Sequence, residues 1–270
     1  MRGVHLRKKL FYIISFLLFV FPLLFLVYKS FFGVWRWGNP VPVEPNLRAW
    51  QVLINEGEFV NSIGASIWIA IVVLAINLLI GVTSGRVFSL SSFRGKSIVE
   101  ALLMLPLFLP VLVVAIGLHI TFIRYGLADH WTGVALVHLV PTIPYSIKMF
   151  KAGYERIGTK LIEQSAMLGG RAFQRFYHIE LPLLLPSIRS VLFLTIVISL
   201  SQYVLTAIIG GGNVVTLSMV YYPFTDTADE AVMAAFSIVF ALIPIILYII
   251  LEGCLKFSLP YQHPRGRKNL

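Results

Sequence analysis

Polar side chains recur at helical spacing inside an otherwise apolar stretch of the chain. They are Thr195, Ser199, Gln202 and Thr206, at positions i, i+4, i+7 and i+11, which one face of an α-helix brings together. Hydroxyl and amide groups on such a face hydrogen-bond a neighbouring helix or a polar solute, because leaving them in lipid is costly. The stripe therefore indicates either interhelical packing or the lining of a solute path, and Asn77 in another apolar stretch points the same way.

Motifs of the common enzyme classes are absent from the sequence. It has no G-x-x-x-x-G-K-[ST] phosphate loop, no H-E-x-x-H and no G-x-S-x-G. Its single cysteine, Cys254, excludes an intramolecular disulfide and a cysteine metal cluster. His119 and His138 fall within or near apolar runs, where a histidine either serves a ligand or proton or is hydrogen-bonded internally. We predict no catalytic residues, no metal site and no cofactor bound by this chain, so energy must come from a gradient or another chain.

The elements that carry these side chains are predicted to be membrane-spanning helices. Only 13% of the residues are charged, whereas about 25% is usual in soluble domains. A helix needs about 20 apolar residues to cross a bilayer, and the runs lack the alternation of barrel strands. The runs that are long enough, or nearly so, are Leu10–Tyr28, Phe59–Gly85, Ala101–Ile123, Trp131–Ile147, Ser187–Ile209 and Ala231–Leu251. The fold class is therefore an all-α integral membrane protein, with six transmembrane helices in a single domain over residues 1–270.

The distribution of charge predicts the orientation of these spans. Most lysines and arginines lie in the two tails and in the connections after the second and fourth spans. The positive-inside rule then places both termini in the cytoplasm, which requires an even number of spans. This topology accounts for the net charge of +10 without nucleic acid, and it indicates a multi-pass protein of a bacterial cytoplasmic membrane. An acidic cluster before the last span, Asp226, Asp229 and Glu230, either docks a partner protein or solvates a loop.

A polar segment between the fourth and fifth spans interrupts the apolar pattern. Thr159 can cap a helix over Lys160–Leu168, Gly169–Gly170 can end it, and Ala172–Ile179 has a second helical pattern. The first piece is roughly 14 Å long at 1.5 Å per residue, too short to cross a bilayer. Three interpretations are open: an amphipathic surface helix, a helix-turn-helix on DNA, or a knob that docks into a partner. Both ends are tied close to membrane spans, which disfavours DNA.

This segment resembles the EAA loop of ABC-importer membrane subunits, the permeases that work with a solute-binding protein. The family pattern is roughly E-A-A-x-x-x-G, then nine residues, then I-x-L-P. The same spacing occurs here within a loop of about residues 151–186, with Gln164-Ser165 in place of two alanines. The residues assigned to the loop by this resemblance are Glu163, Gln164, Ser165, Gly169, Gly170, Arg171, Ile179, Leu181 and Pro182.

The resemblance implies a membrane subunit of a type I ABC importer. Two such subunits, identical or related, would form the pore, and a pair of cytoplasmic ABC ATPase chains would bind the ATP. The short helix before Gly169 would be a cytoplasmic coupling helix between spans four and five, seated in a cleft of the ATPase. Glu163 would pair with a basic group there, and Leu181 and Pro182 would anchor the loop's return to the bilayer. A solute-binding protein would deliver cargo from outside.

The cargo is less clearly indicated. Residues Leu200–Phe224 resemble the polyamine, thiamine, iron and phosphonate branch of these permeases, and "LSQY" before a glycine-rich stretch leans toward thiamine. We therefore expect a small polar or charged solute. The alternatives are a gradient-driven secondary carrier, which usually has ionisable residues at mid-membrane, and a non-transporting membrane scaffold. Glu100 and Glu252 lie only near span ends, which disfavours a carrier, and co-purification with an ATPase would separate the three classes.

Overall fold

The computed structural model describes residues 2–32, 45–226 and 229–258, and within these ranges the regular elements are all helical. Four helices of the described part are long and apolar enough to cross a membrane, and six spans result if each of two bent helix pairs counts as one. The all-α prediction is therefore confirmed. The apolar runs become helices because a bilayer leaves each backbone N–H and C=O to be satisfied within its own segment.

Helices α4 (Phe59–Leu90) and α7 (Trp131–Ile157) form the central pair of the bundle. Gly81 and Gly85 lie one turn apart on the face of α4 that meets α7. A Cβ atom at Gly85 would come within 2.6 Å of the Phe150 Cβ atom and 2.8 Å of the Lys151 nitrogen. The missing side chains thus permit the close backbone contact that joins membrane helices.

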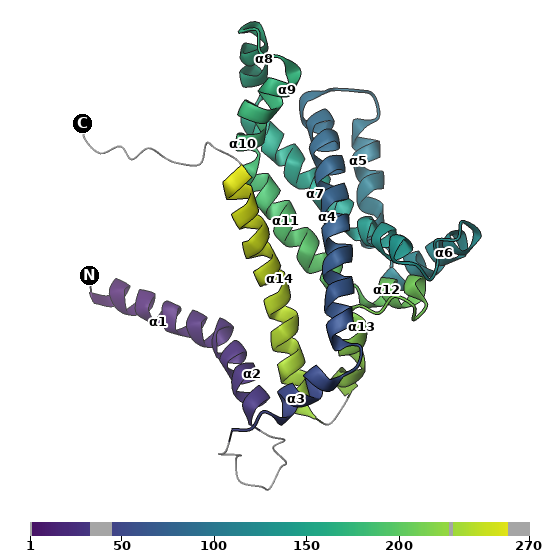
Figure 1. Ribbon diagram of the computed structural model, residues 1–270. Helices are drawn as coiled ribbons and strands as arrows, with labels where there is room; N and C mark the ends of the chain where they lie inside the picture. Colours follow the sequence, from purple (N-terminus) through teal and green to yellow (C-terminus); the bar gives the residue numbers. More distant parts are fainter. Residues whose placement is uncertain (1, 33–44, 227–228, 259–270) are drawn as a thin grey trace.

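Two more helices complete the packed bundle. Helix α11 (Leu185–Leu200) contacts α4, α7 and α14 (Glu230–Ser258). Their shared apolar cluster includes Phe150, Tyr154, Leu184 and Leu192. Toward the other end of the molecule, α3 (Arg48–Asn55) and α13 (Leu217–Tyr221) pack with the start of α14, where the 3-10 turn η3 (Tyr222–Asp226) also lies. Long helices thus connect the two ends of the bundle (Figure 1).

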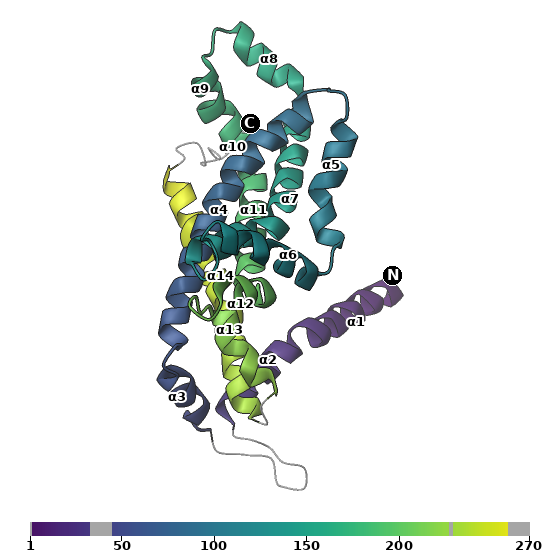
Figure 2. The ribbon, with the colours of Figure 1, turned by 90° about the vertical axis from the view of Figure 1, so that its right-hand side faces the viewer.

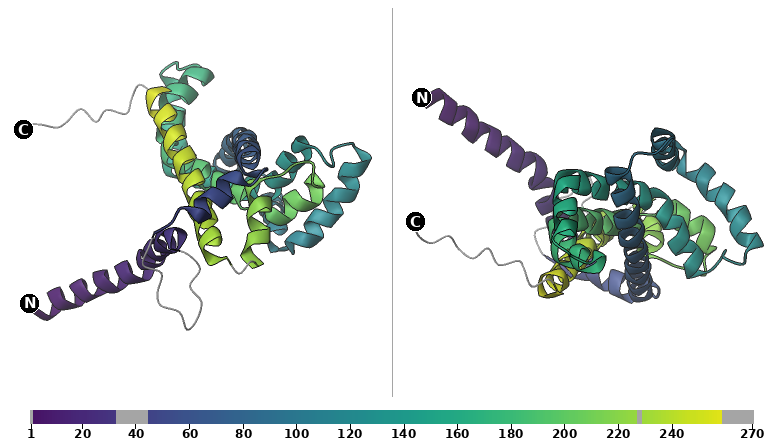
Figure 3. Two further views of the ribbon diagram at one scale, coloured as in Figure 1. Left: turned by 60° about the horizontal axis from the view of Figure 1, so that its bottom comes forward. Right: turned by 90° about the horizontal axis from the view of Figure 1, so that it is seen from above.

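The first expected span leaves the bundle. It consists of α1 (Arg2–Phe19) and α2 (Phe21–Phe31), with Pro22 in the first turn of α2. Helix α2 contacts α14, whereas α1 extends away from the other helices, on the side opposite the α5–α6 region (Figures 1 and 3). None of the described side chains of α1 is buried.

The third expected span, Ala101–Ile123, is not one continuous helix. Helix α5 (Lys96–Met104) passes into the 3-10 turn η1 (Leu105–Phe108), and α6 (Val111–Arg124) then departs at a bend of 103° (Figure 2). Pro106 and Pro110 lie in this region, and a proline lacks the N–H that continues a helix and disfavours helical backbone in the residue before it. The bend therefore has a local cause in the sequence.

The fifth expected span, Ser187–Ile209, is interrupted at a place different from the second bent pair, which joins Ala172–Leu183 to Leu185–Leu200 at 69°. Helix α11 ends at Leu200, and α12 (Tyr203–Gly210) begins after Gln202, whose ψ of 88° is not helical. No proline causes this break. The Gln202 carbonyl instead accepts hydrogen bonds from the Thr206 hydroxyl at 2.6 Å and the Ser218 hydroxyl at 3.2 Å. Side-chain donors thus satisfy a carbonyl at the break, as a lipid environment requires of any interrupted helix.

Candidate functional site

The segment after α7 forms a projection at one end of the molecule (Figures 1 and 2). Helix α8 (Thr159–Met167) begins at Thr159 after Gly158, whose φ is 75°, and no side chain caps it. The predicted capping role of Thr159 is therefore wrong, because a glycine turn starts the helix and places Thr159 inside it. The helix itself matches the predicted short element.

The predicted reversal at the glycine pair is present. Gly169 has a φ of 80°, which glycine adopts without steric cost. Its N–H donates to the Ala166 carbonyl at 3.0 Å, and the Gly170 N–H donates to the Ser165 carbonyl at 3.2 Å. Ser165 is buried, and its hydroxyl donates to the Ile162 carbonyl. The alanine-to-serine departure thus adds a bond within α8 and does not disturb the turn.

The chain returns through α9 (Ala172–Arg175), a π-helical turn η2 (Phe176–Glu180) and the short α10 (Leu181–Leu183). The second predicted helix is therefore present, with a widened last turn. The backbone N–H of exposed Arg171 donates to the Gln174 side chain at 3.3 Å. Leu181 packs on the bundle core, and Pro182 occupies the first turn of α10, where its missing N–H costs little.

The tip of this projection exposes large apolar side chains. Met167, Leu168 and Phe173 are 84%, 88% and 77% exposed, and Glu163 is exposed beside them. A groove of about 480 Å³ lies between α8 and the returning segment. Its lining includes Leu161, Gln164, Ser165, Leu168, Arg175 and Ile179. Apolar side chains gathered on a projecting element are typical of a surface that another protein covers.

A buried acid lies at the base of the projection. Glu180 is 1% exposed, and its Oε1 accepts a hydrogen bond from Arg86 Nη2 of α4 at 3.0 Å. The Tyr154 hydroxyl of α7 donates to its Oε2 at 3.2 Å. Sequence reasoning missed this cluster, because Arg86 counted only toward the topology. The available signal was an acid between two apolar residues, Ile179 and Leu181, at the start of a span.

A second polar cluster lies among the apolar helices, around His138 of α7. This residue is 1% exposed. Its Nδ1 lies 3.0 Å from the Ser199 hydroxyl and its Nε2 lies 2.9 Å from the Thr206 hydroxyl. Since Thr206 donates to the Gln202 carbonyl, it accepts from Nε2–H, and Nδ1 of the neutral imidazole then accepts from Ser199. His138 thus joins α7 to both sides of the break in the fifth span.

The cluster continues into α4 through Asn77. The Asn77 side-chain amide donates to the Thr142 hydroxyl at 2.8 Å, and Thr142 donates to the His138 carbonyl at 2.8 Å. Ser146 donates to the Asn77 carbonyl at 2.7 Å. The Asn77 Oδ1 atom is buried and has no partner among the described residues. Three of the sequence-predicted polar residues, Asn77, Ser199 and Thr206, therefore belong to one interhelical network.

The other two residues of the predicted stripe differ from these. Thr195 is buried in α11. Gln202 is half-buried at the break, and its side-chain amide has no hydrogen bond to another described residue. The expectation that all four residues share one face of a single helix is wrong, because the helix ends between Ser199 and Gln202.

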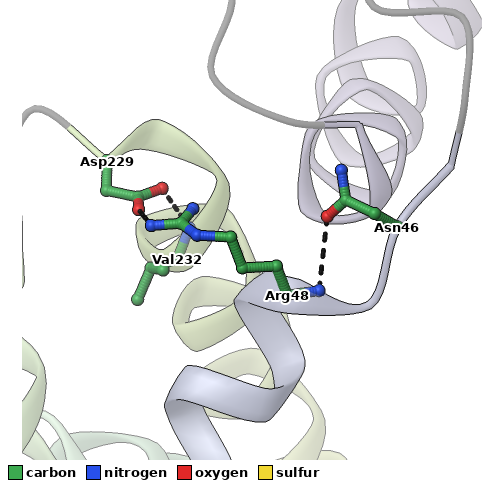
Figure 4. A network of polar contacts seen from close by, with 4 residues as sticks. All are labelled: Asn46, Arg48, Asp229 and Val232. Carbon is green, nitrogen blue, oxygen red and sulfur yellow. Dashed lines mark hydrogen bonds and ion pairs between the residues drawn. The ribbon is translucent and has the colours of Figure 1, made fainter.

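The acidic cluster before the last span is held by bases of distant segments. Asp229 accepts from Arg48 Nη2 at 2.5 Å and from the Val232 N–H at 3.3 Å, and Asn46 caps the Arg48 N–H (Figure 4). The hydrogen bond to Asp229 and its charge raise the pKa of Arg48. Glu230 pairs with Lys29. Asp229 and Glu230 thus connect α14 to α3 and α2 by ion pairs and do not simply solvate a loop. The side chain of Asp226 lies outside the described side chains.

Metal ligands do not gather in the part of the chain that the structure describes, where no three of His, Cys, Asp and Glu come together. The groups brought together are hydrogen-bonding and ion-pairing groups between helices. Such an arrangement can orient helices and pass a solute or a movement.

Known proteins with similar sequence or structure are transport permeases. Residues 77–254 match the family described as binding-protein-dependent transport system inner membrane component. The molybdate/tungstate transport system permease protein WtpB of Pyrococcus abyssi is 32% identical over 51% of this chain, and the match spans only 55% of that relative. The spermidine/putrescine transport system permease protein PotC homolog of Mycoplasma pneumoniae is 24% identical over 92% of this chain and 91% of its own length.

A solved bacterial ABC transporter that imports the polysaccharide alginate has the same fold, with a TM-score of 0.69 over 93% of this chain and 96% of that one. At 14% identity this likeness shows the fold alone. The family match, in contrast, covers more than half of the sequence and includes both the projecting segment and the His138 network. The chain therefore belongs to the family of binding-protein-dependent transport system inner membrane components, the permease subunits of type I ABC importers.

Proposed function

We propose that this chain is half of the pore of an ATP-driven importer and receives its energy through the segment from Thr159 to Pro182. A second permease subunit, identical or related, completes the pore. ATP is bound by a separate pair of cytoplasmic ATPase chains, and this chain itself binds no cofactor. The observation that carries the proposal is the exposed apolar tip of Met167, Leu168 and Phe173 on a projection from the bundle, within a member of this family.

The proposed topology has six spans in one transmembrane domain, with both termini in the cytoplasm. Counting each bent helix pair as one span supports the number six. The connection after α4, which contains Arg94 and Lys96, lies at the same end of the molecule as α8 and the end of α14 (Figure 1). The positive-inside rule assigns this basic end to the cytoplasm, where an ATPase would meet α8.

Docking at this end involves the groove and the tip together. The ATPase surface would cover Leu168 and Phe173 and insert apolar groups beside Leu161. Glu163 is exposed and available to a basic side chain of the partner. The turn at Gly169–Gly170 sets the angle between α8 and the return segment. Exposed apolar area of this kind is stabilised on burial by about 25 cal/mol per Å².

The proposed translocation path runs past the broken fifth span. Gln202 is half-buried at the break, and its amide has no hydrogen bond to another residue that the structure describes, which suits a group that exchanges hydrogen bonds with a passing solute. Asn77, Thr195, Ser199 and Thr206 form the wall behind it, because their side chains are buried between helices. The solute itself would be selected chiefly by an extracytoplasmic solute-binding protein.

The proposed cargo is a small charged or polar solute. The relatives include permeases for molybdate/tungstate and for spermidine/putrescine, and the sequence around Leu200–Phe224 favours a polyamine-like or thiamine-like compound. The longer match to the spermidine/putrescine relative supports a cationic amine. Uptake of radiolabelled spermidine and of molybdate, measured side by side in cells carrying the complete operon, would separate the two.

Proteoliposomes containing this chain and its co-purified ATPase test the proposed energy source. With binding protein and solute outside, uptake should require ATP on the ATPase side and should not respond to an ion gradient. A gradient-driven carrier or a scaffold needs no ATPase. Uptake driven by a gradient without ATP, or failure of the chain to retain any ATPase, would contradict the proposal.

A further inference from the structure

Glu180 joins the projecting segment to the bundle by directional contacts. Its two carboxylate oxygens have separate partners, Arg86 on α4 at 3.0 Å and Tyr154 on α7 at 3.2 Å. Arg86 lies near the end of α4, which closes at Leu90, and Tyr154 lies in the last turn of α7. A single side chain of the return segment thus contacts both central helices.

The two helices that receive these contacts form a tightly packed pair. Gly81 and Gly85 of α4 leave no room for a side chain against Phe150 of α7. Closely packed elements move as rigid units, because interiors do not deform continuously. A displacement of Glu180 therefore acts on α4 and α7 together, and α4 extends to the opposite end of the molecule (Figure 1).

Apolar side chains also attach the base of the projection to the bundle. Leu181 packs on the core cluster around Tyr154 and Leu184. Apolar contacts are non-directional and allow neighbouring surfaces to slide. Hydrogen bonds to a carboxylate are directional, and a carboxylate with partners on two helices constrains its position relative to both. The charged contact is therefore the one suited to transmit a movement.

We propose that Glu180, with Arg86 and Tyr154, is the joint through which movement of the α8–α9 segment reaches the α4–α7 pair. This inference rests on the proposed function, since the movement would come from a docked ATPase. The three side chains are positioning residues and contact neither ATP nor solute. Without the joint, the segment would still hold an ATPase, but the far end of α4 would no longer respond to nucleotide.

Substitutions can separate the joint from simple stability. Glu180→Gln keeps the shape of the side chain and removes its charge, while Tyr154→Phe removes one hydrogen bond and leaves the ion pair of Glu180 with Arg86 intact. The matched control is Glu252→Gln. Glu252 is similarly enclosed, with a 13% exposed side chain, and pairs with Arg189 between α11 and α14 at 2.8 Å. It belongs to the last part of α14, whose end lies at the same end of the molecule as α8 (Figure 1), and it joins a different pair of helices.

Two single-cysteine reporters in a Cys254→Ser background read the two ends separately. Asn61→Cys reports on the far end of α4, where Asn61 is exposed, and Leu168→Cys reports on the tip. The labelling rate of each with a maleimide is measured in the complex with its ATPase, without nucleotide and with ATP and vanadate. At Asn61→Cys, Glu180→Gln should reduce the nucleotide-dependent change in rate by about tenfold, within the usual range of coupling between sites.

Tyr154→Phe should reduce the nucleotide-dependent change in labelling rate at Asn61→Cys by a smaller factor. Glu252→Gln should leave this change as large as in the parent protein. ATPase should protect Leu168→Cys from labelling in the parent and in all three variants. The proposed joint would be contradicted if the labelling rate at Asn61→Cys still changed with nucleotide as much as in the parent in both Glu180→Gln and Tyr154→Phe, even if yield or melting temperature fell. Should Glu180→Gln fail to fold, Tyr154→Phe decides alone. Absence of protection at Leu168→Cys in the parent would instead contradict the proposed docking.

Discussion

Two buried polar clusters connect α7 to its neighbours, and they differ in charge. The Glu180 cluster lies at the base of the projection and contains an ion pair with Arg86. The His138 cluster lies among the apolar helices and consists of an imidazole and the hydroxyls of Ser199 and Thr206. An isolated ion costs several kcal/mol to bury and most at mid-membrane. The chain thus has charge near a helix end, and groups without a fixed charge beside the broken span.

The two kinds of contact differ in how strongly they resist separation and in how easily they change partners. A charged contact resists separation because each ion left behind is strongly destabilised. A hydroxyl can exchange its partner for a backbone carbonyl of its own helix, as Thr206 already does with Gln202. The Glu180 cluster therefore suits the transmission of force, whereas the His138 cluster suits a region where helices rearrange around a solute.

The largest expected effect on stability comes from removing one ion of the charged cluster. Arg86→Ala leaves Glu180 buried without its cation and should destabilise the protein by about 3–5 kcal/mol. Thermal unfolding of the detergent-purified protein measures this. The double variant Arg86→Ala/Glu180→Ala should be more stable than the single one, and equal midpoints for the two would show that the pair is not the source of the loss.

A smaller effect is expected in the uncharged cluster. His138→Leu leaves the Ser199 and Thr206 hydroxyls without the imidazole, which should cost about 1–3 kcal/mol. The same unfolding assay applies, with His138→Gln as the variant that keeps a donor and an acceptor. If His138→Leu lowered the midpoint more than Arg86→Ala, the contrast between the clusters would be reversed.

The close packing of α4 against α7, which lies beside the Glu180 cluster, can be tested by a substitution in α4. Gly85→Ala places a methyl group against Phe150 and the Lys151 backbone and should destabilise by about 1–3 kcal/mol through overpacking. Gly253→Ala in α14 is the control, because a Cβ atom there meets nothing within 4 Å. Identical midpoints for both variants would mean that α4 and α7 are not held rigidly together.

The smallest effect on stability is expected at the break. Gln202→Leu removes an amide that has no hydrogen bond within the described part of the chain and should change the unfolding free energy by less than about 0.5 kcal/mol. Uptake of the transported solute should nevertheless fall, because the amide is proposed to contact it. If uptake were unchanged, the polar residues around Gln202 would serve helix packing alone and would not contact the solute.

The sequence predicted the helices well and their breaks only in part. Apolar runs show which residues avoid water, and this is enough to find the long apolar helices. The bend between α5 and α6 has a local signal in the sequence, Pro106 and Pro110. The break at Gln202 has no such marker, since it depends on hydroxyls of Thr206 and Ser218 that meet one carbonyl only in the folded protein.

In the candidate sites, too, features set by local sequence could be predicted, whereas contacts between distant segments could not. The loop from Glu163 to Pro182 was recognisable because its spacing is local, and its turn at Gly169 follows from glycine geometry. Arg86 and Glu180 are 94 residues apart, and His138 and Thr206 are 68 apart. No periodicity within a helix links such positions, so only the packing of α4, α7 and the fifth span reveals these pairs.

The central claim is that energy enters through the projecting segment, and a pair of glycine variants tests it most directly. Gly169 and Gly95 have φ values of 80° and 83°, and a Cβ atom at either meets nothing within 4 Å. A β-branched residue is strained equally at both positions, but only Gly169 lies in the proposed docking segment. The measurement is solute uptake per ATP hydrolysed in proteoliposomes of Gly169→Val and Gly95→Val. We predict a loss of about tenfold or more for Gly169→Val and a ratio near the parent value for Gly95→Val. Equal ratios in the two variants would contradict the account.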